Sequence, residues 1–403
     1  MLLNHPKKNF DMPILADRTL CTGCTACMNK CSKNAIVMQA DTTGFLFPIV
    51  SKNVCVECGV CTKSCPIVTK VKSETPKEIH AYIMQNTNEK IRAESTSGGA
   101  FTSIAEIIID RGGVVFGAAF TSEFVVKHRY VETKADLALF RNSKYVQSEI
   151  GNTYRKVKEF LKSERWVCFS GTPCQILGLL GYLGTVSKDR LITVDLVCHC
   201  VPSPFIFNKY IDYQKKHIGN FDKLVFRDKK FGYSYSTMAL YKGEKCDYRN
   251  GSESDLWFRA FLHGFCDRDS CNFCGAQEWP RHSDITIWDC FAVRNIDKSF
   301  DDNQGTTSVV SWSSKGHDVI NECKNTKKLE VDSSIFRHKI EREHFNDLMT
   351  VNKVRMYEDA HNMDCDTFFA KYLPNSPKIR IKRIIRKFLF RLGLYEIIKR
   401  ILR

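Results

Sequence analysis

Eight cysteines near the start of the chain repeat one spacing twice. Each set has the spacing C-x2-C-x2-C-x3-C, and Pro66 follows the second set. The sets are Cys21, Cys24, Cys27 and Cys31, then Cys55, Cys58, Cys61 and Cys65. Such a spacing suits two [4Fe-4S] cubanes, each with three thiolates from its own loop and a fourth from the other set. We therefore expect Cys65 to complete the first cluster and Cys31 to complete the second.

Two other uses of these cysteines are a multi-zinc module and a disulfide framework. A tetrahedral zinc site needs only two such pairs and has no use for a third thiolate two residues further on. A disulfide framework implies secretion, but MLLNHPKKNF lacks the apolar core of a secretory signal. The nineteen cysteines are an odd number, and eight already belong to cluster loops. This usage indicates a reducing cytoplasm, as in an anaerobe.

A second group of cysteines follows strand-like segments further along the chain. Cys174 lies in WVCFSGTPCQIL and Cys198 ends LITVDLVC, each at the carboxyl end of an expected strand. Because carboxyl ends of parallel strands share one edge of a sheet, these two thiols could meet there. Cys271 and Cys274 form a C-x2-C pair that could complete a third metal site with them. The alternative is that each lone cysteine is a small buried residue.

A serine- and glycine-rich turn precedes an apolar helix. Ser97, Gly98 and Gly99 lie in ESTSGGAF, where free amides at a helix start would suit a phosphate or the polar edge of a flavin. Serine-capped helices that begin after glycine are common without any ligand. The turn is therefore only a candidate ligand site, because its sequence alone does not distinguish ligand binding from an ordinary helix cap.

Strand and helix signals alternate after the cluster loops. Residues up to about Lys70 form the cluster domain, and the polar segment KSETPK links it to an α/β body. Predicted strands are 114–120, 124–131, 166–169, 191–197, 224–226 and 236–241. Predicted helices are 101–109, 153–161, 175–183, 205–217 and 255–262.

The net charge of +15 is concentrated at one end of the chain. Residues 376–403 hold ten Lys or Arg against Glu396 alone, with apolar residues recurring every three or four positions. A basic amphipathic helix of this kind suits an anionic membrane surface, with docking on a protein as the alternative. Stacking aromatics are not interleaved with these charges, so we expect no nucleic-acid binding. The apolar region around Ile104 to Phe120 is interrupted by Glu106, Asp110 and Arg111, so we expect no membrane span.

Several ordered motifs make the chain resemble the coenzyme F420 hydrogenase/dehydrogenase beta subunit family, in the branch with an N-terminal two-cluster ferredoxin domain. The motifs are SGGAF from Ser97, SKYVQS from Ser143, GTPCQ from Gly171, DLVCHCVPSP from Asp195, FRDKKFG from Phe226, SCNFC from Ser270 and SDITIWD to Asp289. The resemblance implies an α+β ferredoxin-like domain (1–70), then an α/β flavin-binding body and the basic amphipathic tail (376–403). Within the body it implies a flavin-binding N-terminal part (78–150) and a C-terminal part with the third cluster (151–375).

The resemblance also implies cofactors and site residues. It implies a bound FAD and a third [4Fe-4S] cluster, for which the candidate ligands are Cys174, Cys198, Cys271 and Cys274. The candidate flavin contacts are Ser97, Gly98, Gly99, Lys144, Tyr145 and Gln147. Cys200 replaces a glycine usual in relatives and competes with Cys198 as ligand, and Trp288 likewise replaces a glycine in SDITIGD.

These parts predict an iron–sulfur flavoprotein oxidoreductase. Clusters pass single electrons, and a flavin can exchange them with two-electron substrates. Ferredoxin or another redox protein is the expected partner, His199 a candidate proton donor, and electron flow could run in either direction. The substrate is a deazaflavin coenzyme or an organic molecule, for example a surface-polysaccharide precursor. The alternative is an electron-transfer subunit without its own substrate site, which docks on a partner enzyme. We expect a cytoplasmic protein, with the tail as a peripheral contact to the inner face of the membrane.

Overall fold

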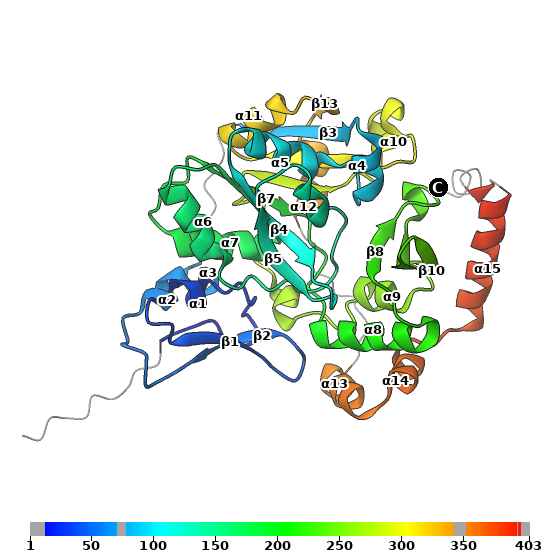
Figure 1. Cartoon of the computed structure of the whole chain (residues 1–403), viewed down its shortest axis with the longest axis horizontal. Coiled ribbons are helices and arrows are strands. Elements are labelled where there is room, and N and C mark those ends of the chain that lie inside the picture. The colour runs from blue at the N-terminus through cyan, green and yellow to red at the C-terminus, as the bar shows by residue number, and fades with distance from the viewer. Residues whose placement is uncertain (1–12, 71–77, 342–351, 393, 396–403) are drawn as a thin grey trace, which may run out of the picture.

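The computed structural model describes residues 13–70, 78–341, 352–392 and 394–395. The N-terminal domain is small and lies beneath α6 (Thr153–Lys162) and α7 (Pro173–Leu183) in Figure 1. Its strands β1 (Ile36–Ala40) and β2 (Leu46–Val50) pair antiparallel. Its short helices are α1 (Ala26–Lys30), α2 (Val60–Ser64) and α3 (Pro66–Thr69). In each cysteine set, the third member lies in the first turn of α1 or α2, and the fourth directly follows that helix.

One mixed sheet of eight strands forms the centre of the body, in the order β13-β3-β12-β11-β7-β6-β4-β5. The four strands β4, β6, β7 and β11 run parallel, and the others pair antiparallel. The strands are β3 (His80–Asn86), β4 (Val114–Phe120), β5 (Val126–Val131), β6 (Val167–Ser170), β7 (Leu191–Leu196), β11 (Ile285–Asp289), β12 (Thr307–Ser311) and β13 (Thr326–Val331). This sheet takes strands from both predicted parts of the body.

The expected α/β character of the body is confirmed, because helices pack against this sheet. Their buried side chains form separate apolar clusters around β4, β6 and β7, one including α5 (Ala100–Asp110) and another α6 and α7. The parallel neighbours β6 and β7 end at the same edge of the sheet, as the sequence predicts. The loops that follow these two strands therefore carry Cys174 and Cys198 to one place.

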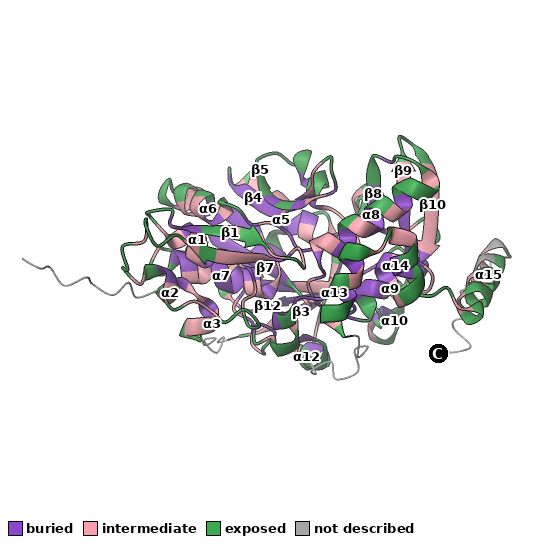
Figure 2. Ribbon diagram, turned by 90° about the horizontal axis from the view of Figure 1, so that it is seen from below, coloured by how far each residue is buried: buried purple, intermediate pink, exposed green. Residues whose placement is uncertain are grey.

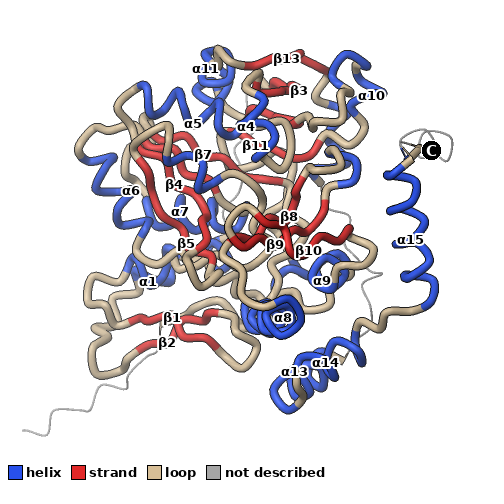
Figure 3. The backbone as a smooth tube through the Cα atoms, turned by 45° about the vertical axis from the view of Figure 1, so that its right-hand side comes forward, coloured by secondary structure: helices blue, strands red, loops and turns tan. Residues whose placement is uncertain are grey.

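A second, three-stranded sheet lies beside the large one (Figure 3). Its strands are β8 (Lys223–Asp228), β9 (Thr237–Lys242) and β10 (Lys245–Gly251), all antiparallel. Aromatic side chains from this sheet pack with those of α8 (Pro204–Ile218) and α9 (Leu256–Leu262), including the fully buried Trp257 and Phe226. Helices α13 (Lys353–Asn362) and α14 (Cys365–Tyr372) complete this cluster. Further short elements are α4 (Glu89–Glu94), α10 (Val293–Ile296), α11 (Ser314–Glu322) and α12 (Ser334–Ile340).

The predicted basic tail begins as the helix α15 (Pro377–Arg391), and residues 393 and 396–403 of the tail lie outside the described residues. In Figure 2, α15 projects from one end of the molecule and is largely exposed. It touches the body through Phe390, which stacks on Tyr235 at 4.6 Å between ring centroids. Within the described part of the chain, no helix is long and apolar enough to cross a membrane.

Candidate metal centres

The cysteines of the first loop gather with the last cysteine of the second. Cys21 and Cys65 both lie close enough to act electrostatically on Cys24 and Cys27. Burial, together with a smaller effect of the neighbouring sulfurs, raises the pKa of the Cys24 thiol to about 12. Buried thiolates this close together need a compensating cation, which cluster iron supplies. This set, which we call the inner set, has the membership expected for one cubane.

The second loop differs from the first in its exposure. Cys31 acts electrostatically on Cys61, as expected if both serve the other cluster. Cys58 is exposed, and Cys55 is partly exposed. Three valines around them, Val54, Val56 and Val60, are 46%, 59% and 37% exposed. We call Cys31, Cys55, Cys58 and Cys61 the outer set, because its loop, between β2 and α2, lies at the edge of the molecule away from the body (Figure 1).

The inner set lies directly against the body. A Cβ atom on Gly178 of α7 would lie 2.7 Å from Cβ and 2.9 Å from Sγ of Cys24, so only glycine allows this approach. Tyr154 is fully buried beside the same contact, where its hydroxyl donates to the Gln175 carbonyl at 2.7 Å. Both Cys24 and Cys174 act electrostatically on Tyr154, so the inner set and the first turn of α7 are neighbours.

The third group of cysteines converges as predicted from the shared sheet edge. Cys271 and Cys274 both act electrostatically on Cys174, whose pKa burial raises to about 12. Cys271 and Cys198 act on Cys200 in the same way. Thr172 and Gln175 form a capping box at the start of α7, which fixes the turn that carries Cys174. We call Cys174, Cys198, Cys200, Cys271 and Cys274 the body set.

Two neighbouring cysteines still compete within the body set. Cys200 is only 7% exposed, and its thiol lies 3.8 Å from the carbonyl oxygen of Phe261 on α9. Cys198 is partly exposed, and its carbonyl accepts a hydrogen bond from Gln277 at 2.8 Å. The Cys271 sulfur accepts the backbone N–H of Val201, the residue after Cys200, at 3.3 Å, so the C-x2-C pair contacts the loop that carries both candidates. Both cysteines therefore remain candidate ligands.

A cleft of about 1640 Å³ opens between the two sheets and α15. Its volume exceeds the about 300–1,000 Å³ typical of small-ligand pockets. Aromatic rings form part of its lining, among them Tyr145, Tyr233, Tyr235, Phe258, Phe261, Trp288 and Phe291. Arg227 extends into it and bonds to Asp289 at 3.2 Å and to the Tyr145 hydroxyl at 3.3 Å. The cleft thus offers flat apolar surfaces together with a fixed ion pair.

Two of the predicted cofactor and catalytic residues line this cleft. Tyr145 lies there, stacked on Phe261 at 4.5 Å between ring centroids. His199 also lines it, packed edge-on against Phe261, and follows Cys198 directly. The body set is therefore adjacent to the cleft.

The other predicted flavin contacts have structural partners of their own. The Gly98 amide donates to Thr307 Oγ1 at 2.9 Å, and the Ser97 hydroxyl donates to the Thr306 carbonyl at 2.5 Å. Gly99 takes a positive φ of 84° as the N-cap of α5. The turn therefore lies against the strand β12, and its role in flavin binding stays a prediction.

Lys144 and Gln147 lie apart from the lining of the cleft. The Lys144 amine donates to the carbonyls of Leu139 and Arg141, and burial lowers its pKa to about 7. Gln147 lies beside Gly23 of the inner set's loop, where a Cβ on that glycine would meet its amide nitrogen at 2.8 Å. Both assignments as flavin contacts stay predictions.

Sequence reasoning missed the importance of two arginines. Arg227 belongs to a charge run that reads as solvated, yet its side chain is only 12% exposed. Arg268 lies in the run Asp267-Arg268-Asp269 and is 1% exposed. The available signal for Arg268 was its position between Cys266 and Cys271, inside a cysteine-rich segment that a metal site would bury.

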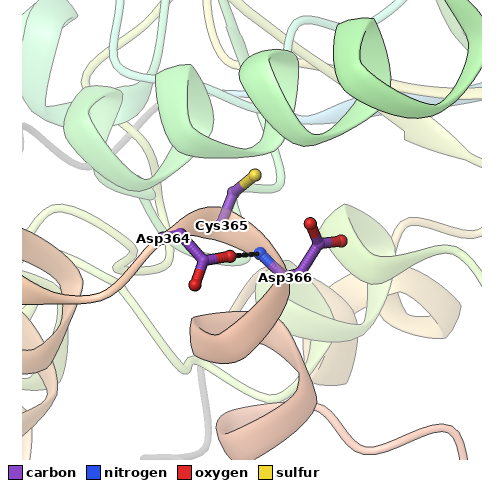
Figure 4. A group of neighbouring side chains, drawn as sticks. All are labelled: Asp364, Cys365 and Asp366. Atoms are coloured by element: carbon purple, nitrogen blue, oxygen red, sulfur yellow. Dashed lines mark hydrogen bonds between the residues drawn. The ribbon is translucent and has the colours of Figure 1, made fainter.

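A separate group of ligand-type side chains, Asp364, Cys365 and Asp366, begins α14 far along the chain from the cysteine loops (Figure 4). Asp364 is the N-cap of the helix and accepts the backbone N–H of Asp366 at 2.9 Å. Asp366 forms ion pairs with Lys216 and His217. Helix capping and ion pairing thus account for both carboxylates.

Comparisons with known proteins give two family matches. Residues 164–335 match the model of the C terminus of the coenzyme F420 hydrogenase/dehydrogenase beta subunit, and residues 20–71 match that of a 4Fe-4S dicluster domain. Among solved structures, a chain of the xenon-derivatised F420-reducing [NiFe] hydrogenase complex from Methanosarcina barkeri is similar. The similarity covers 72% of this chain and 94% of that chain, at 14% identity and a TM-score of 0.46. None of the curated proteins matches the sequence.

Proposed function

We propose that the chain is an iron–sulfur flavoprotein oxidoreductase, from the premise that residues 20–71 match a 4Fe-4S dicluster domain and residues 164–335 match the C terminus of the coenzyme F420 hydrogenase/dehydrogenase beta subunit. The matches confirm the predicted resemblance and an electron-transfer role based on iron–sulfur clusters. The proposal adds a third cluster in the body set, FAD in the cleft and a two-electron substrate. Bound clusters would supply one-electron steps, and a bound flavin would couple them to two-electron chemistry.

The serial order of the cysteine sets is the observation that carries this proposal. Cys58 of the outer set is exposed, and the inner set adjoins the outer set through the packing of α1 on α2. Cys24 of the inner set contacts Gly178, one helical turn beyond Cys174 of the body set. His199 then connects the body set to the cleft. Electron carriers placed in this order would link a donor at the outer set with the cleft.

The exposed outer loop supports docking of ferredoxin or a similar redox protein. Apolar side chains of Val54, Val56 and Val60 surround Cys58 there, and Lys52 and Lys63 are exposed nearby. A small acidic electron carrier would find both apolar contact and opposite charge at this loop.

Side chains of the cleft support binding of a flat, partly anionic molecule. Tyr233 donates to Asp289 at 2.8 Å, and this carboxylate also holds Arg227, so both groups are fixed before a ligand arrives. The His199 imidazole at the cleft wall is the candidate proton donor. A deazaflavin coenzyme or a glycan precursor would satisfy this chemistry equally, and either direction of electron flow is compatible with it.

The tail supports peripheral contact with an anionic membrane. On α15 the side chains Ile381, Ile384, Ile385 and Phe388 are all more than half exposed, and the helix is rich in lysine and arginine. This combination of an apolar face with flanking cations is typical of helices that lie on lipid headgroups. We therefore propose that the protein works at the inner face of the cell membrane.

Anaerobic purification followed by cofactor analysis tests the proposed function. We expect about twelve irons, a matching amount of sulfide and one FAD per chain, by the four-iron arithmetic of cubanes. The double variant Cys271→Ser/Cys274→Ser should lose about four irons and keep the two N-terminal clusters. In this variant, ferredoxin reduced by dithionite should no longer reduce the flavin.

Cys246→Ser is the matched control, because Cys246 lies on β10 and bonds only locally, to the Tyr248 carbonyl and Arg249. It should keep both iron and flavin reduction. Normal flavin reduction in the double variant would remove the body set from the electron path. About eight irons without flavin in the unmodified chain, even after reconstitution with FAD, would favour an electron-carrying adaptor subunit instead.

A further inference from the structure

Arg268 connects the loop of the body set to the loop of the inner set. Its backbone lies three residues before Cys271, and its carbonyl accepts the Cys271 N–H at 2.8 Å. Its guanidinium reaches the N-terminal domain, where Nε donates to the Cys21 carbonyl at 2.7 Å and Nη2 donates to the Leu46 carbonyl at 3.0 Å. The side chain therefore spans the junction between two predicted clusters.

The surroundings of this guanidinium exclude water. Arg268 is 1% exposed, and its guanidinium lies over the rings of Phe47 at 4.2 Å and Phe45 at 5.2 Å. A Cβ on Gly23, in the inner loop, would come within 3.0 Å of Nη1, so the loop backbone packs directly on the charge. Arginine keeps its proton under all ordinary conditions, so a full positive charge is buried here.

No carboxylate balances this charge within the described residues. The ion pairs formed by its neighbour Asp267 go to Lys353, and the hydrogen bonds of the guanidinium go to two carbonyls and, at 3.4 Å, to the Gln147 side-chain oxygen. A buried charge without a counter-charge is costly. The anionic groups that this region can supply are the cysteine thiolates. The charge of Arg268 acts to lower the pKa of Cys174 in the body set, and the contacts of its guanidinium with the Cys21 carbonyl and Gly23 place the same charge directly against the loop of the inner set.

We propose that Arg268 is the counter-charge of the inner cluster and raises its reduction potential. A cubane with four thiolates is anionic and gains one negative charge on reduction, so a fixed cation nearby favours the reduced form. The proposal rests on the proposed function, since it requires a cluster in the inner set. Arg268 is a positioning residue in this sense, because it acts through the cluster loop and touches no substrate.

The raised potential would have a direct effect on electron transfer. A higher potential at the inner set draws electrons from the exposed outer set toward the body and holds them away from solvent. Because Arg268 also bonds to the Cys21 carbonyl, docking of the N-terminal domain and tuning of its inner cluster depend on one side chain. An undocked domain would lack this cation and carry a lower-potential cluster.

Redox titration followed by electron paramagnetic resonance tests this role in the full chain. Arg268→Gln removes the charge and keeps a side-chain amide donor. We expect the midpoint potential of one cluster to fall by about 59 mV. For a one-electron couple this is a tenfold weakening of the reduction equilibrium. Arg268→Lys restores a charge at the same place and should keep that equilibrium within about threefold of the unmodified chain.

A matched control is Arg259→Gln, because Arg259 also donates to two backbone carbonyls, those of Leu373 and Pro374, with no cysteine among its partners. It should leave all midpoints unchanged. Unchanged midpoints in Arg268→Gln with full iron content would overturn the proposal. If Arg268→Gln loses iron, Arg268→Lys decides, since loss of iron or of the midpoint in both variants would mean that hydrogen-bond geometry and not charge is required.

Iron analysis of the unmodified chain separates this inference from the proposed function. An unmodified chain without iron at the inner set would contradict the proposed function itself. Full iron content together with midpoint potentials that do not change in the Arg268 variants would contradict only the role of Arg268.

Discussion

Lys229 is the residue whose environment departs most clearly from its appearance in the sequence. It belongs to the run Arg227-Asp228-Lys229-Lys230, yet its amine donates to the carbonyls of Arg92, Ser97 and Gln304 at 2.6–2.8 Å. It thereby ties the Ser97 turn to the small sheet. Burial lowers the pKa of Lys229 to about 7, although Asp289 opposes the shift. A run of charged residues in the sequence therefore does not show that each of their side chains is exposed.

This lowered pKa gives stability a pH dependence. Below pH 7 the Lys229 amine is protonated in both the folded and the unfolded chain, so it adds no pH dependence to the free energy of unfolding. Between pH 7 and 10.5 the unfolded chain binds more protons than the folded one, so raising the pH favours folding. We expect Lys229 to add a slope of at most about 1.4 kcal/mol per pH unit.

Urea unfolding at pH 7 and pH 9 of the unmodified chain and of Lys229→Met measures this slope. The stability difference between the two proteins should grow in favour of the unmodified chain at pH 9. Lys230→Met is the control, because Lys230 is the next residue in the chain and its side chain is exposed. An equal difference at both pH values would show that Lys229 stays charged in the folded chain.

At the scale of elements, the sequence predicts the parallel centre of the body best. The expected strand 114–120 is β4 itself, and the helices expected at 153–161 and 205–217 are α6 and α8 within one residue at each end. In these segments the apolar residues recur with a clear period, and glycine, proline or serine lies at their ends. The convergence of Cys174 and Cys198 followed from the same reasoning, because their strands are parallel neighbours.

Four strands of the large sheet had no sequence prediction, and their positions explain why. The interior strand β3 is buried on both faces, so HAYIMQN shows no alternation of polar and apolar residues. The strands β11 and β12 include Thr and Ser at buried positions, so neither strand forms an apolar run in the sequence. The Thr286 hydroxyl of β11 accepts from Trp312 Nε1 at 2.7 Å. The edge strand β13 is mostly polar. The contacts of Arg268 were equally hidden, since they join residues more than 200 positions apart.

The contact between the N-terminal domain and α7 depends on one glycine. Gly178→Ala would place a methyl group 2.7 Å from Cys24 Cβ and 3.0 Å from the Tyr154 hydroxyl. Both neighbours are held in place, so we expect a loss of about 1–3 kcal/mol in stability and reduced iron content at the inner set. Thermal unfolding and iron analysis would measure both effects.

Gly275→Ala is a suitable control for this prediction. A Cβ at Gly275 would meet nothing within 4 Å, although the residue follows Cys274 directly. Its iron content and stability should match those of the unmodified chain. A Gly178→Ala protein as stable and iron-loaded as this control would mean that the domain can shift on α7 without cost.

At the scale of the whole molecule, the N-terminal cysteine sets (inner and outer) and α15 lie at opposite ends. The N-terminal domain lies on one side of the body and α15 on the other (Figure 1). The cleft lies near α15, which contributes Arg386 to its lining and anchors that arginine on Glu253 at 2.5 Å. A membrane under α15 would therefore adjoin the cleft and leave the outer set accessible to a soluble donor.

Vesicle flotation tests this orientation. The full chain should float with vesicles that contain anionic lipid and remain unbound to neutral ones, whereas a chain ending at Pro374 should bind neither. Ile384→Ser/Phe388→Ser keeps every charge and should weaken binding about tenfold or more, because each buried apolar side chain contributes about 1.5–3 kcal/mol. Equal flotation of the full and shortened chains would exclude the tail as the membrane contact.

The place of β3 in the large sheet has a consequence for how the chain is made. β3 comprises residues 80–86, yet both of its partners, β12 and β13, lie beyond residue 306. A ribosome releases this strand long before either partner exists, so both of its edges stay open while more than 200 further residues are translated. We expect newborn chains to need a holding chaperone during this interval, and the sheet to close only after β13 has been translated.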